Sequence, residues 1–167
     1  MKKIFLLLSI VSVFGLTSCS SDDDNVDYDT IAAVTEHTVN MTYNNTTGKY
    51  NGLVTFTTPM YDSDVVLVYR LTDDGEGFTV WQQIPRTIYM GADEVDYDFN
   101  FTADDVLLTV DANFDLATAP QFTQGQTFRI VQVPGYFAST VDTNDFEAVM
   151  SALSEKQGKT VQIEKLN

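Results

Sequence analysis

Cys19 is the only cysteine of the chain, and it closes the segment Leu-Thr-Ser-Cys directly after a short apolar run. Residues 1–3 are Met-Lys-Lys, and the apolar run over residues 4–16 is too short to span a bilayer with such flanks. This order is the layout of a bacterial lipoprotein signal peptide. We therefore expect residues 1–18 to be removed and the Cys19 thiol to receive a diacylglyceryl group. Two or three acyl chains, with about 0.8 kcal/mol per buried methylene, would hold the protein on a membrane permanently.

The residues after Cys19 indicate where this anchor lies. Residues 20–24 (Ser-Ser-Asp-Asp-Asp) resemble the serine-plus-acid tract that takes lipoproteins of Bacteroidota to the outer face of the outer membrane. A solvated acidic spacer is the alternative. The tripeptide Asp29-Thr30-Ile31 has the aspartate, hydroxyl, aliphatic order that the same phylum uses for O-glycosylation. We expect an outer-membrane lipoprotein at the cell surface, with Thr30 as its candidate glycosylation site.

The composition is that of a strongly acidic globular chain. Nine Lys and Arg accompany 24 Asp and Glu, for a net charge of −15, and the loss of Lys2 and Lys3 with the signal makes it −17. Such a surface repels nucleic acid, which is therefore not an expected partner. A hydrophobic content of 44% is ample for one core. Once Cys19 is acylated, no thiol remains for disulfides, thiol catalysis or cysteine metal sites.

The chain divides into a tether and one domain. Residues 19–36 are polar, acidic and poor in aliphatic side chains. They bury too little apolar surface to offset the entropy of ordering, and we interpret them as a lipidated, flexible stalk. From His37 the pattern changes to short segments rich in Val, Thr, Tyr and Phe, with turn residues between them. Residues 37–167 are therefore the predicted single domain.

The spacing of these segments predicts an all-β fold. The expected strands cover residues 38–44, 49–58, 63–71, 78–84, 94–102, 106–110 and 126–133. Residues 65–69 are apolar on both faces, which suits a central strand covered from two sides. In the strand that ends near Phe101, aromatic residues alternate with carboxylates, and this alternation fixes the register. About seven strands favour a two-sheet antiparallel sandwich of immunoglobulin-like architecture, with a small barrel as the second choice.

One helix is expected near the carboxyl end. Asn144 and Glu147 are spaced as in a capping box, and apolar residues then recur on one helical face as far as Leu153. This pattern predicts a helix over residues 145–156, docked on its own sheet and ended by Gly158. Residues 160–163 are expected to return as a last strand.

Several segments together resemble small flavobacterial surface lipoproteins. They are residues 65–71 (VVLVYRL), Trp81, the aromatic-acidic strand ending in Phe101, and residues 128–136 (FRIVQVPGY). The resemblance covers most of the chain after the stalk, and it implies the same architecture and address without an activity. Such proteins are sometimes named dihydrolipoamide dehydrogenase, an enzyme that needs a Gly-rich dinucleotide turn and a redox pair of cysteines. This sequence has neither, so no cofactor is expected.

Few residues could catalyse a reaction. His37 is the only histidine, and at the junction of stalk and first strand it is expected to be solvent-exposed without a task. Glu94, Asp96 and Asp98 share one strand face, and pairs of carboxylates can hydrolyse glycosides. Adjacent acids on an exposed face, however, usually contact only water. We therefore do not expect an enzyme.

Calcium is the metal that this sequence comes closest to binding. Two segments begin like a calcium loop, with oxygen-bearing side chains at alternate positions: Asp111, Asn113 and Asp115, and again Asp142 and Asn144. Neither loop is completed, because Leu116 occupies the glycine position of the first and Phe146 interrupts the second. A structural turn is the expected role of both. An irregular site that combines Asp104, Asp105 and Asp111 is an open alternative.

Two functions of different classes remain. In the first, the domain is a non-catalytic binding or adhesion module whose loops present aromatic rings to a polysaccharide. The candidate rings are Tyr61, Trp81, Tyr89 and Tyr136, each of which could pack in the core instead. In the second, the protein is a structural or accessory subunit of an envelope complex, and a protein partner binds its surface.

Overall fold

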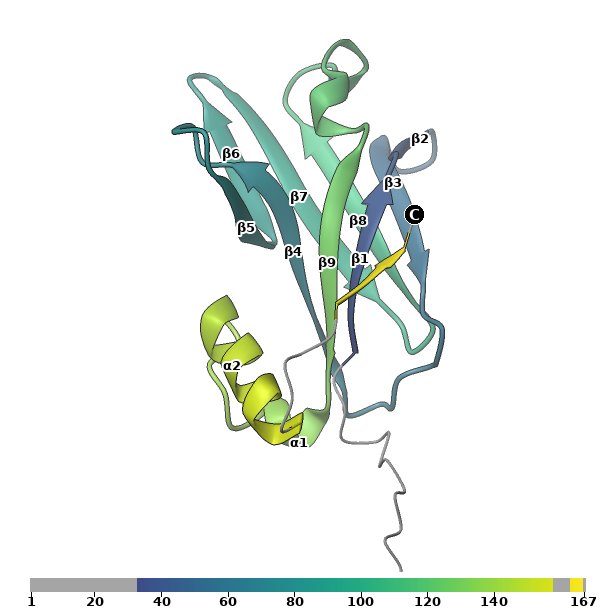
Figure 1. Cartoon of the computed structure of the whole chain (residues 1–167). Coiled ribbons are helices and arrows are strands. Elements are labelled where there is room, and N and C mark those ends of the chain that lie inside the picture. The colour runs from purple at the N-terminus through teal and green to yellow at the C-terminus, as the bar shows by residue number, and fades with distance from the viewer. Residues whose placement is uncertain (1–32, 158–162, 167) are drawn as a thin grey trace, which may run out of the picture.

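The computed structural model describes residues 33–157 and 163–166, apart from the side chains of Tyr136, Phe137, Lys156 and Gln157 (Figure 1). The candidate modification sites Cys19 and Thr30 lie outside this part of the chain. The strands are β1 (Ala33–Val39), β2 (Thr42–Asn44), β3 (Lys49–Thr55), β4 (Val65–Asp73), β5 (Thr79–Ile84), β6 (Arg86–Met90), β7 (Asp93–Phe101), β8 (Asp105–Ala112), β9 (Gln126–Val133) and β10 (Ile163–Leu166). The helices are α1 (Gly135–Ala138) and α2 (Phe146–Gln157), with short 3-10 turns η2 (Leu116–Thr118) and η3 (Pro120–Phe122).

The strands form two five-stranded sheets (Figure 1). The first sheet has the order β10-β1-β9-β4-β5, and the second has the order β2-β3-β8-β7-β6. Each recorded pairing is antiparallel except that of β10 with β1, which is parallel. The predicted all-β two-sheet sandwich with a carboxyl-terminal helix is therefore confirmed, although the described residues form ten strands where about seven were predicted.

The main core lies between the two sheets. Alternate residues of each strand point inward, as the two-residue period of a β-strand requires. Its fully buried members include Val68, Phe128 and Ile130 from the first sheet and Val95, Val106, Leu108 and Val110 from the second. The predicted register of β7 is confirmed, because Val95 and Tyr97 are buried while Asp96 and Asp98 are exposed.

A second apolar cluster lies on the outer face of the first sheet, under α2 (Figure 1). Leu67 and Tyr69 of β4 pack in this cluster with Val149 and Leu153 of α2. Because Val66 and Val68 of the same strand face the main core, β4 is covered from both sides, as its sequence predicts.

Helix α2 begins and ends one residue later than predicted, and its cap differs. The N-cap is Asp145 rather than Asn144, because Asp145 Oδ1 accepts a hydrogen bond from the Ala148 amide at 3.1 Å. Asn144 instead donates its own amide to Asp142 Oδ1 at 3.0 Å. The return strand is β10, which begins at the last residue of the predicted segment.

The start of the domain corrects the predicted boundary at residue 37. β1 begins at Ala33 and takes in four residues that were assigned to the stalk, because Val34 and Glu36 point to the covered face of the first sheet. The strand predicted over residues 38–44 is two strands in different sheets. The chain crosses between the sheets at Asn40 and Met41, where the Met41 amide donates to the Thr123 carbonyl at 2.7 Å.

Two further features of the structure differ from the sequence predictions. His37 lies within β1 and is half-buried, so the expected solvent-exposed histidine is wrong. Burial lowers the pKa of His37, although Glu164 opposes this effect, and its Nε2 lies 3.0 Å from Thr35 Oγ1.

Strand β6 was not predicted, because Pro85 interrupts the alternating pattern of the sequence. At this proline the chain leaves β5 in the first sheet and enters β6 in the second.

Candidate functional site

The outer face of the second sheet carries exposed polar side chains, among them Asp96 and Asp98. In residues 33–157 and 163–166, α2 covers the outer face of the first sheet, and no helix lies over that of the second (Figure 1). Two hollows of about 390 Å³ each involve this sheet. One lies on its outer face, and the other lies on its core-facing side beside the β2–β3 hairpin, since Tyr43 and Tyr50 share the face of the buried Val110. Each hollow falls in the size range of small-molecule sites.

The first hollow, here the charged hollow, crosses four strands of the second sheet. It is lined by Lys49, Pro85, Arg86, Thr87, Asp96, Tyr97, Asp98, Thr109 and Asp111. The register places Asp96 opposite Asp111 on one side and opposite Thr87 on the other. The alternation of β7 turns Asp96 and Asp98 outward together.

The polar groups of the charged hollow are close to one another and to solvent. Lys49 Nζ lies 3.7 Å from Asp111 Oδ2, and the two side chains are 46% and 45% exposed. The Thr87 hydroxyl donates to Asp96 Oδ1. A solvated ion pair of this kind contributes little to stability, so its members can exchange partners with a ligand. The hollow therefore offers donors and acceptors to a polar molecule.

The second hollow, here the aromatic hollow, lies beside the β2–β3 hairpin. It is lined by Tyr43, Gly48, Tyr50, Asp111, Ala112, Phe114, Asp115, Leu116 and Ala117. Strand pairing places Tyr43 opposite Tyr50, and their ring centres are 5.2 Å apart in an edge-to-face arrangement. Tyr43 is 49% exposed, and Phe114 is held by an edge-to-face contact with Phe122. The hollow thus presents aromatic surface next to Asp115, whereas the Asp111 carboxylate pairs with Lys49 on the outer face of the sheet.

The local sequence explains how the aromatic hollow is built. Asn44 Oδ1 accepts a hydrogen bond from the Thr46 amide at 2.9 Å, and the Gly48 amide donates to the Asn44 carbonyl at 2.8 Å. Gly48 has a φ of 73°, a left-handed conformation that glycine adopts without strain. On the other side, Asp115 Oδ1 accepts from the Ala117 amide at 2.9 Å and caps η2. Hydrogen-bonded turns therefore fix the backbone on both sides of the aromatic hollow.

The aromatic hollow lies at the end of the sandwich opposite Ala33. β1 runs from Ala33, which pairs with Gln132, to Val39, which pairs with Gln126. The loop between β8 and β9 meets the far end of β1, where the Gly125 amide donates to Asn40 Oδ1. Figure 1 shows this loop and the β2–β3 hairpin at the top and the start of β1 at the bottom. The length of β1 separates the two ends by about 20 Å.

The predicted carboxylate face is present, and the hollow contains part of it. Glu94, Asp96 and Asp98 point to the outside of the second sheet, as expected from the alternation. Asp96 and Asp98 line the charged hollow, whereas Glu94 is not among its residues. Glu94 is held through its main chain instead, because its amide donates to Asn113 Oδ1 at 3.0 Å.

The calcium candidates serve turns and an ion pair. Asp111 pairs with Lys49, Asn113 Nδ2 donates to the Ala92 carbonyl at 2.9 Å, and Asp115 caps η2. The irregular site is not assembled, since Asp105 begins β8 while Asp111 lies near its other end, about 20 Å away along the strand. Among the described residues, no group of three or more His, Cys, Asp or Glu is placed to hold a metal.

The four predicted aromatic candidates lie in different places. Tyr61 is 59% exposed in the β3–β4 connection, at the end of the sandwich where Ala33 lies. Tyr89 is 74% exposed on β6, two residues after Thr87 and on the same face. The side chain of Tyr136 is not among those described. Tyr61, Trp81 and Tyr89 line neither hollow.

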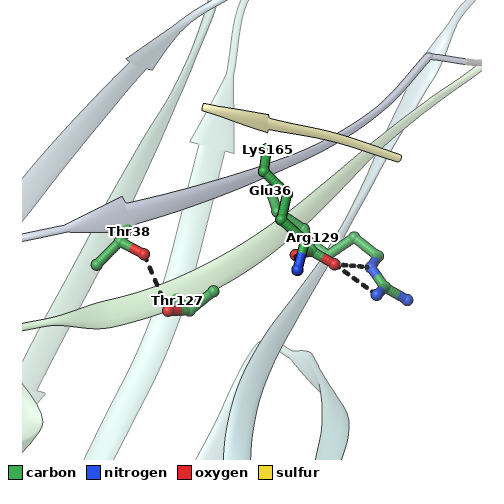
Figure 2. Close-up of polar contacts among 5 residues, drawn as sticks. All are labelled: Glu36, Thr38, Thr127, Arg129 and Lys165. Carbon is green, nitrogen blue, oxygen red and sulfur yellow. Dashed lines mark hydrogen bonds and ion pairs between the residues drawn. The ribbon is translucent and has the colours of Figure 1, made fainter. Parts of the chain in front are cut away.

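Trp81 packs in the protein rather than facing a ligand. The Arg129 guanidinium carbon lies 4.0 Å from the centre of a Trp81 ring and 5.2 Å from that of Phe146 in α2. Arg129 Nε donates to Glu36 Oε1 at 3.0 Å, and Lys165 Nζ lies 3.6 Å from Glu36 Oε2 (Figure 2). The alternative of packing for Trp81 is therefore confirmed, because its ring contacts Arg129 and packs against the second apolar cluster.

The aromatic residues that line the aromatic hollow were not among the predicted candidates. Tyr43 and Tyr50 enclose a turn that contains Asn45 and Gly48, so a hairpin over this turn must bring the two rings together. That pattern was available in the sequence. Phe114 could not be found in this way, because its position depends on the loop between β8 and β9.

In comparisons with known proteins, no family model matches this chain, and neither a curated protein nor a solved structure is significantly similar to it. Within the described residues, no helix is both long enough and apolar enough to cross a bilayer.

Proposed function

We propose that this protein is a lipid-anchored, surface-exposed module of the outer membrane that binds a glycan without catalysing a reaction. The observation that carries the proposal is the aromatic hollow, which is lined by Tyr43, Tyr50 and Phe114 together with the exposed carboxylate residue Asp115. Aromatic rings pack against the apolar faces of sugar rings. Carboxylates accept hydrogen bonds from hydroxyl groups, so the two kinds of side chain together suit a sugar.

The position of the hollow supports attachment at the other end. A chain anchored through Cys19 reaches the domain at Ala33, where β1 begins. The aromatic hollow lies at the opposite end of the sandwich, about 20 Å away. A ligand outside the cell would therefore meet the hollow before it meets the anchored end.

The test is a glycan array probed with the whole mature lipoprotein, purified in detergent. We expect binding to a defined set of glycans, and we expect Tyr43→Ala to weaken it. The matched control is Tyr61→Ala, because Tyr61 is also an exposed tyrosine but lies at the Ala33 end. Binding that Tyr61→Ala reduces and Tyr43→Ala does not would contradict the site. Co-purification of a stoichiometric envelope protein, with no glycan signal, would instead support the accessory-subunit hypothesis.

A further inference from the structure

The aromatic hollow is apolar on its inner side and acidic at its rim. Leu116 lines it and is buried in the main core, and two of its three rings pack against that core. Asp115, the preceding residue, is exposed. Because the Asp111 carboxylate pairs with Lys49 on the outer face of the sheet, Asp115 supplies the carboxylate of this hollow.

Local hydrogen bonds hold Asp115 in place before a ligand arrives. Its Oδ1 accepts from the Ala117 amide at 2.9 Å. Its main-chain carbonyl accepts from the Thr118 hydroxyl at 2.7 Å and from the Thr118 amide at 3.1 Å. These contacts fix the residue at the start of η2 and leave Oδ2 for a ligand. An ammonium donor would meet this carboxylate with an opposite charge as well as a hydrogen bond.

Within the described part of the chain, the aromatic hollow is lined by no Lys, Arg or His. The charged hollow differs, because Lys49 and Arg86 line it. Elsewhere in the domain the chain covers rings with its own cations; the guanidinium carbon of Arg70, for example, lies 4.3 Å from the centre of the Tyr97 ring. The rings of the aromatic hollow are therefore available to a cation from outside, which an aromatic ring attracts over its face.

The charge and the size of the site narrow the ligand class further. A protein with a net charge of −15 attracts cationic ligands over a long range. The hollow measures about 390 Å³, near the lower end of the range of about 300–1,000 Å³ for small-molecule sites, so it suits a short unit. An amino sugar with a free amine combines an apolar ring face with an ammonium group in one such unit.

We infer that the aromatic hollow binds a glycan unit that carries a protonated amine, with the sugar ring on Tyr43 and the ammonium group at Asp115. This inference rests on the proposed function, because it specifies the class of glycan for the same site. Tyr43 provides the ring contact because it is 49% exposed. Asp115 provides the preference for a charged unit over a neutral one.

The test is calorimetric titration of the whole detergent-purified lipoprotein with three β-1,4-linked trisaccharides. Their units are glucose, glucosamine and N-acetylglucosamine, which differ only in the group on one ring carbon. We expect the glucosamine trisaccharide to bind about tenfold more tightly than either neutral one. This preference should shrink as the NaCl concentration rises from about 0.01 M to about 0.5 M, because salt screens exposed charges. Trilysine, a cation without a sugar ring, is expected to bind at least about tenfold more weakly than the glucosamine trisaccharide.

Two variants separate the charge from the ring contact. Asp115→Asn should weaken binding of the glucosamine trisaccharide by about tenfold and that of the neutral ones much less, since asparagine still accepts a hydrogen bond from a hydroxyl group. It also keeps an acceptor for the Ala117 amide, so the cap of η2 remains. Tyr43→Ala should weaken all three.

Asp74→Asn is the matched control for the loss of one charge. Asp74 is an exposed aspartate whose Oδ1 likewise accepts from main-chain amides, those of Glu76 and Phe78, in the β4–β5 turn. It lines neither hollow, and its replacement should leave every affinity unchanged. Circular dichroism and thermal unfolding establish that each variant is folded.

The outcomes distinguish this inference from the proposed function. Neutral trisaccharides that bind as tightly as the glucosamine one, or an array that finds only glycans without a free amine, would overturn the charged ligand and leave glycan binding in place. Equal binding of trilysine, or equal losses in Asp115→Asn and Asp74→Asn, would show that net charge alone causes the preference and would also overturn it. Absence of binding to any saccharide, in both the array and the titrations, would overturn the proposed function and this inference with it.

Discussion

Arg129 is a buried charged residue on the outer face of the first sheet. Its side chain and that of Glu36 are each 10% exposed, and they form an ion pair across β9 and β1. Removing a charge from water costs several kcal/mol, and close pairing with good hydrogen bonds offsets that cost. The rings of Trp81 and Phe146 add a cation–π contribution, which ties α2 to the sheet.

Loss of one partner should therefore be costly. Glu36→Ala is expected to lower the free energy of unfolding by about 3 kcal/mol, because it leaves the Arg129 guanidinium buried without a counter-ion. Chemical denaturation measures this change. Lys165 also pairs with the Glu36 carboxylate, but its side chain is 77% exposed. Lys165→Ala should therefore lower the free energy of unfolding by less than about 1 kcal/mol. Equal losses in the two variants would contradict the assigned role of the Arg129–Glu36 pair.

Two buried tyrosines form a second comparison at the scale of residues. Tyr97 donates its hydroxyl to the Phe122 carbonyl at 2.8 Å, whereas the Tyr69 hydroxyl has no hydrogen-bond partner among the described residues. We expect Tyr97→Phe to lower the free energy of unfolding by about 1 kcal/mol. Tyr69→Phe should leave it unchanged or raise it. Thermal unfolding of the two variants compares them directly, and a larger loss for Tyr69→Phe would refute the assignment.

The same tyrosines predict how stability depends on pH. Burial raises the pKa of both Tyr69 and Tyr97 from 10.0 to about 12. The unfolded chain releases these protons near pH 10, while the folded protein keeps them until about pH 12. Stability from this source is complete below pH 10 and falls as the pH rises from 10 to 12. Urea denaturation across this range measures the loss, which the double variant Tyr69→Phe/Tyr97→Phe should reduce; an identical loss in that variant would rule the tyrosines out.

At the scale of elements, the end of β1 approaches β3 closely enough to require glycine. A Cβ atom on Gly52 would lie 2.5 Å from Val39 Cγ1, which is well inside van der Waals contact. The close approach occurs where the chain leaves the first sheet for the second, just before Met41 enters the core. Contact between these two strands thus depends on the absence of one methyl group.

Gly52→Ala should accordingly destabilise the domain by about 1–3 kcal/mol through overpacking. Val39→Ala removes the opposing methyl groups, so Gly52→Ala should cost less in that background. A double-mutant cycle, measured by chemical denaturation, gives the coupling between the two positions. Additive effects would show that the cost of Gly52→Ala arises elsewhere.

Helix α2 covers part of the outer face of the first sheet and so makes it unavailable to a ligand. Its apolar residues Val149 and Leu153 cover β4, and Phe146 contacts the ring of Tyr69 with centres 4.7 Å apart. The outer face of the first sheet is thereby occupied by the chain itself. The second sheet keeps its outward residues in contact with solvent, and both hollows involve that sheet.

At the scale of the whole molecule, the proposed anchor and the aromatic hollow lie at opposite ends. Cys19→Ser in cells should transfer the protein from the membrane fraction to the soluble fraction and abolish incorporation of labelled palmitate. The physical reason is that the acyl chains supply the membrane affinity, which a serine hydroxyl cannot replace in this pathway. Ser20→Ala is the control. Retention of the Cys19→Ser protein in membranes would argue against lipid anchoring.

Local pattern alone was sufficient for the elements whose residues alternate strictly. β9 was predicted with both its ends, β7 with its register, and α2 to within one residue, since periods of two and 3.6 residues express burial on one face. The boundary at Ala33 and the strand β6 were missed. Both depend on which sheet the segment joins, and the local alternation of polar and apolar residues does not show this.

The sequence by itself determined the acidic charge, the two-sheet architecture and the outward carboxylates of β7, and it is the sole basis for the predicted signal peptide over residues 1–18. Only the tertiary structure decided which of these groups meet. Asp96 and Asp111 meet because β8 lies beside β7, and the Trp81 ring packs under Arg129 because β9 and β5 both flank β4. The physical reason is that the alternation of polar and apolar residues shows which face of a strand is exposed to water. The neighbours on that face depend on the order of strands in the sheet, which brings together residues far apart in the sequence.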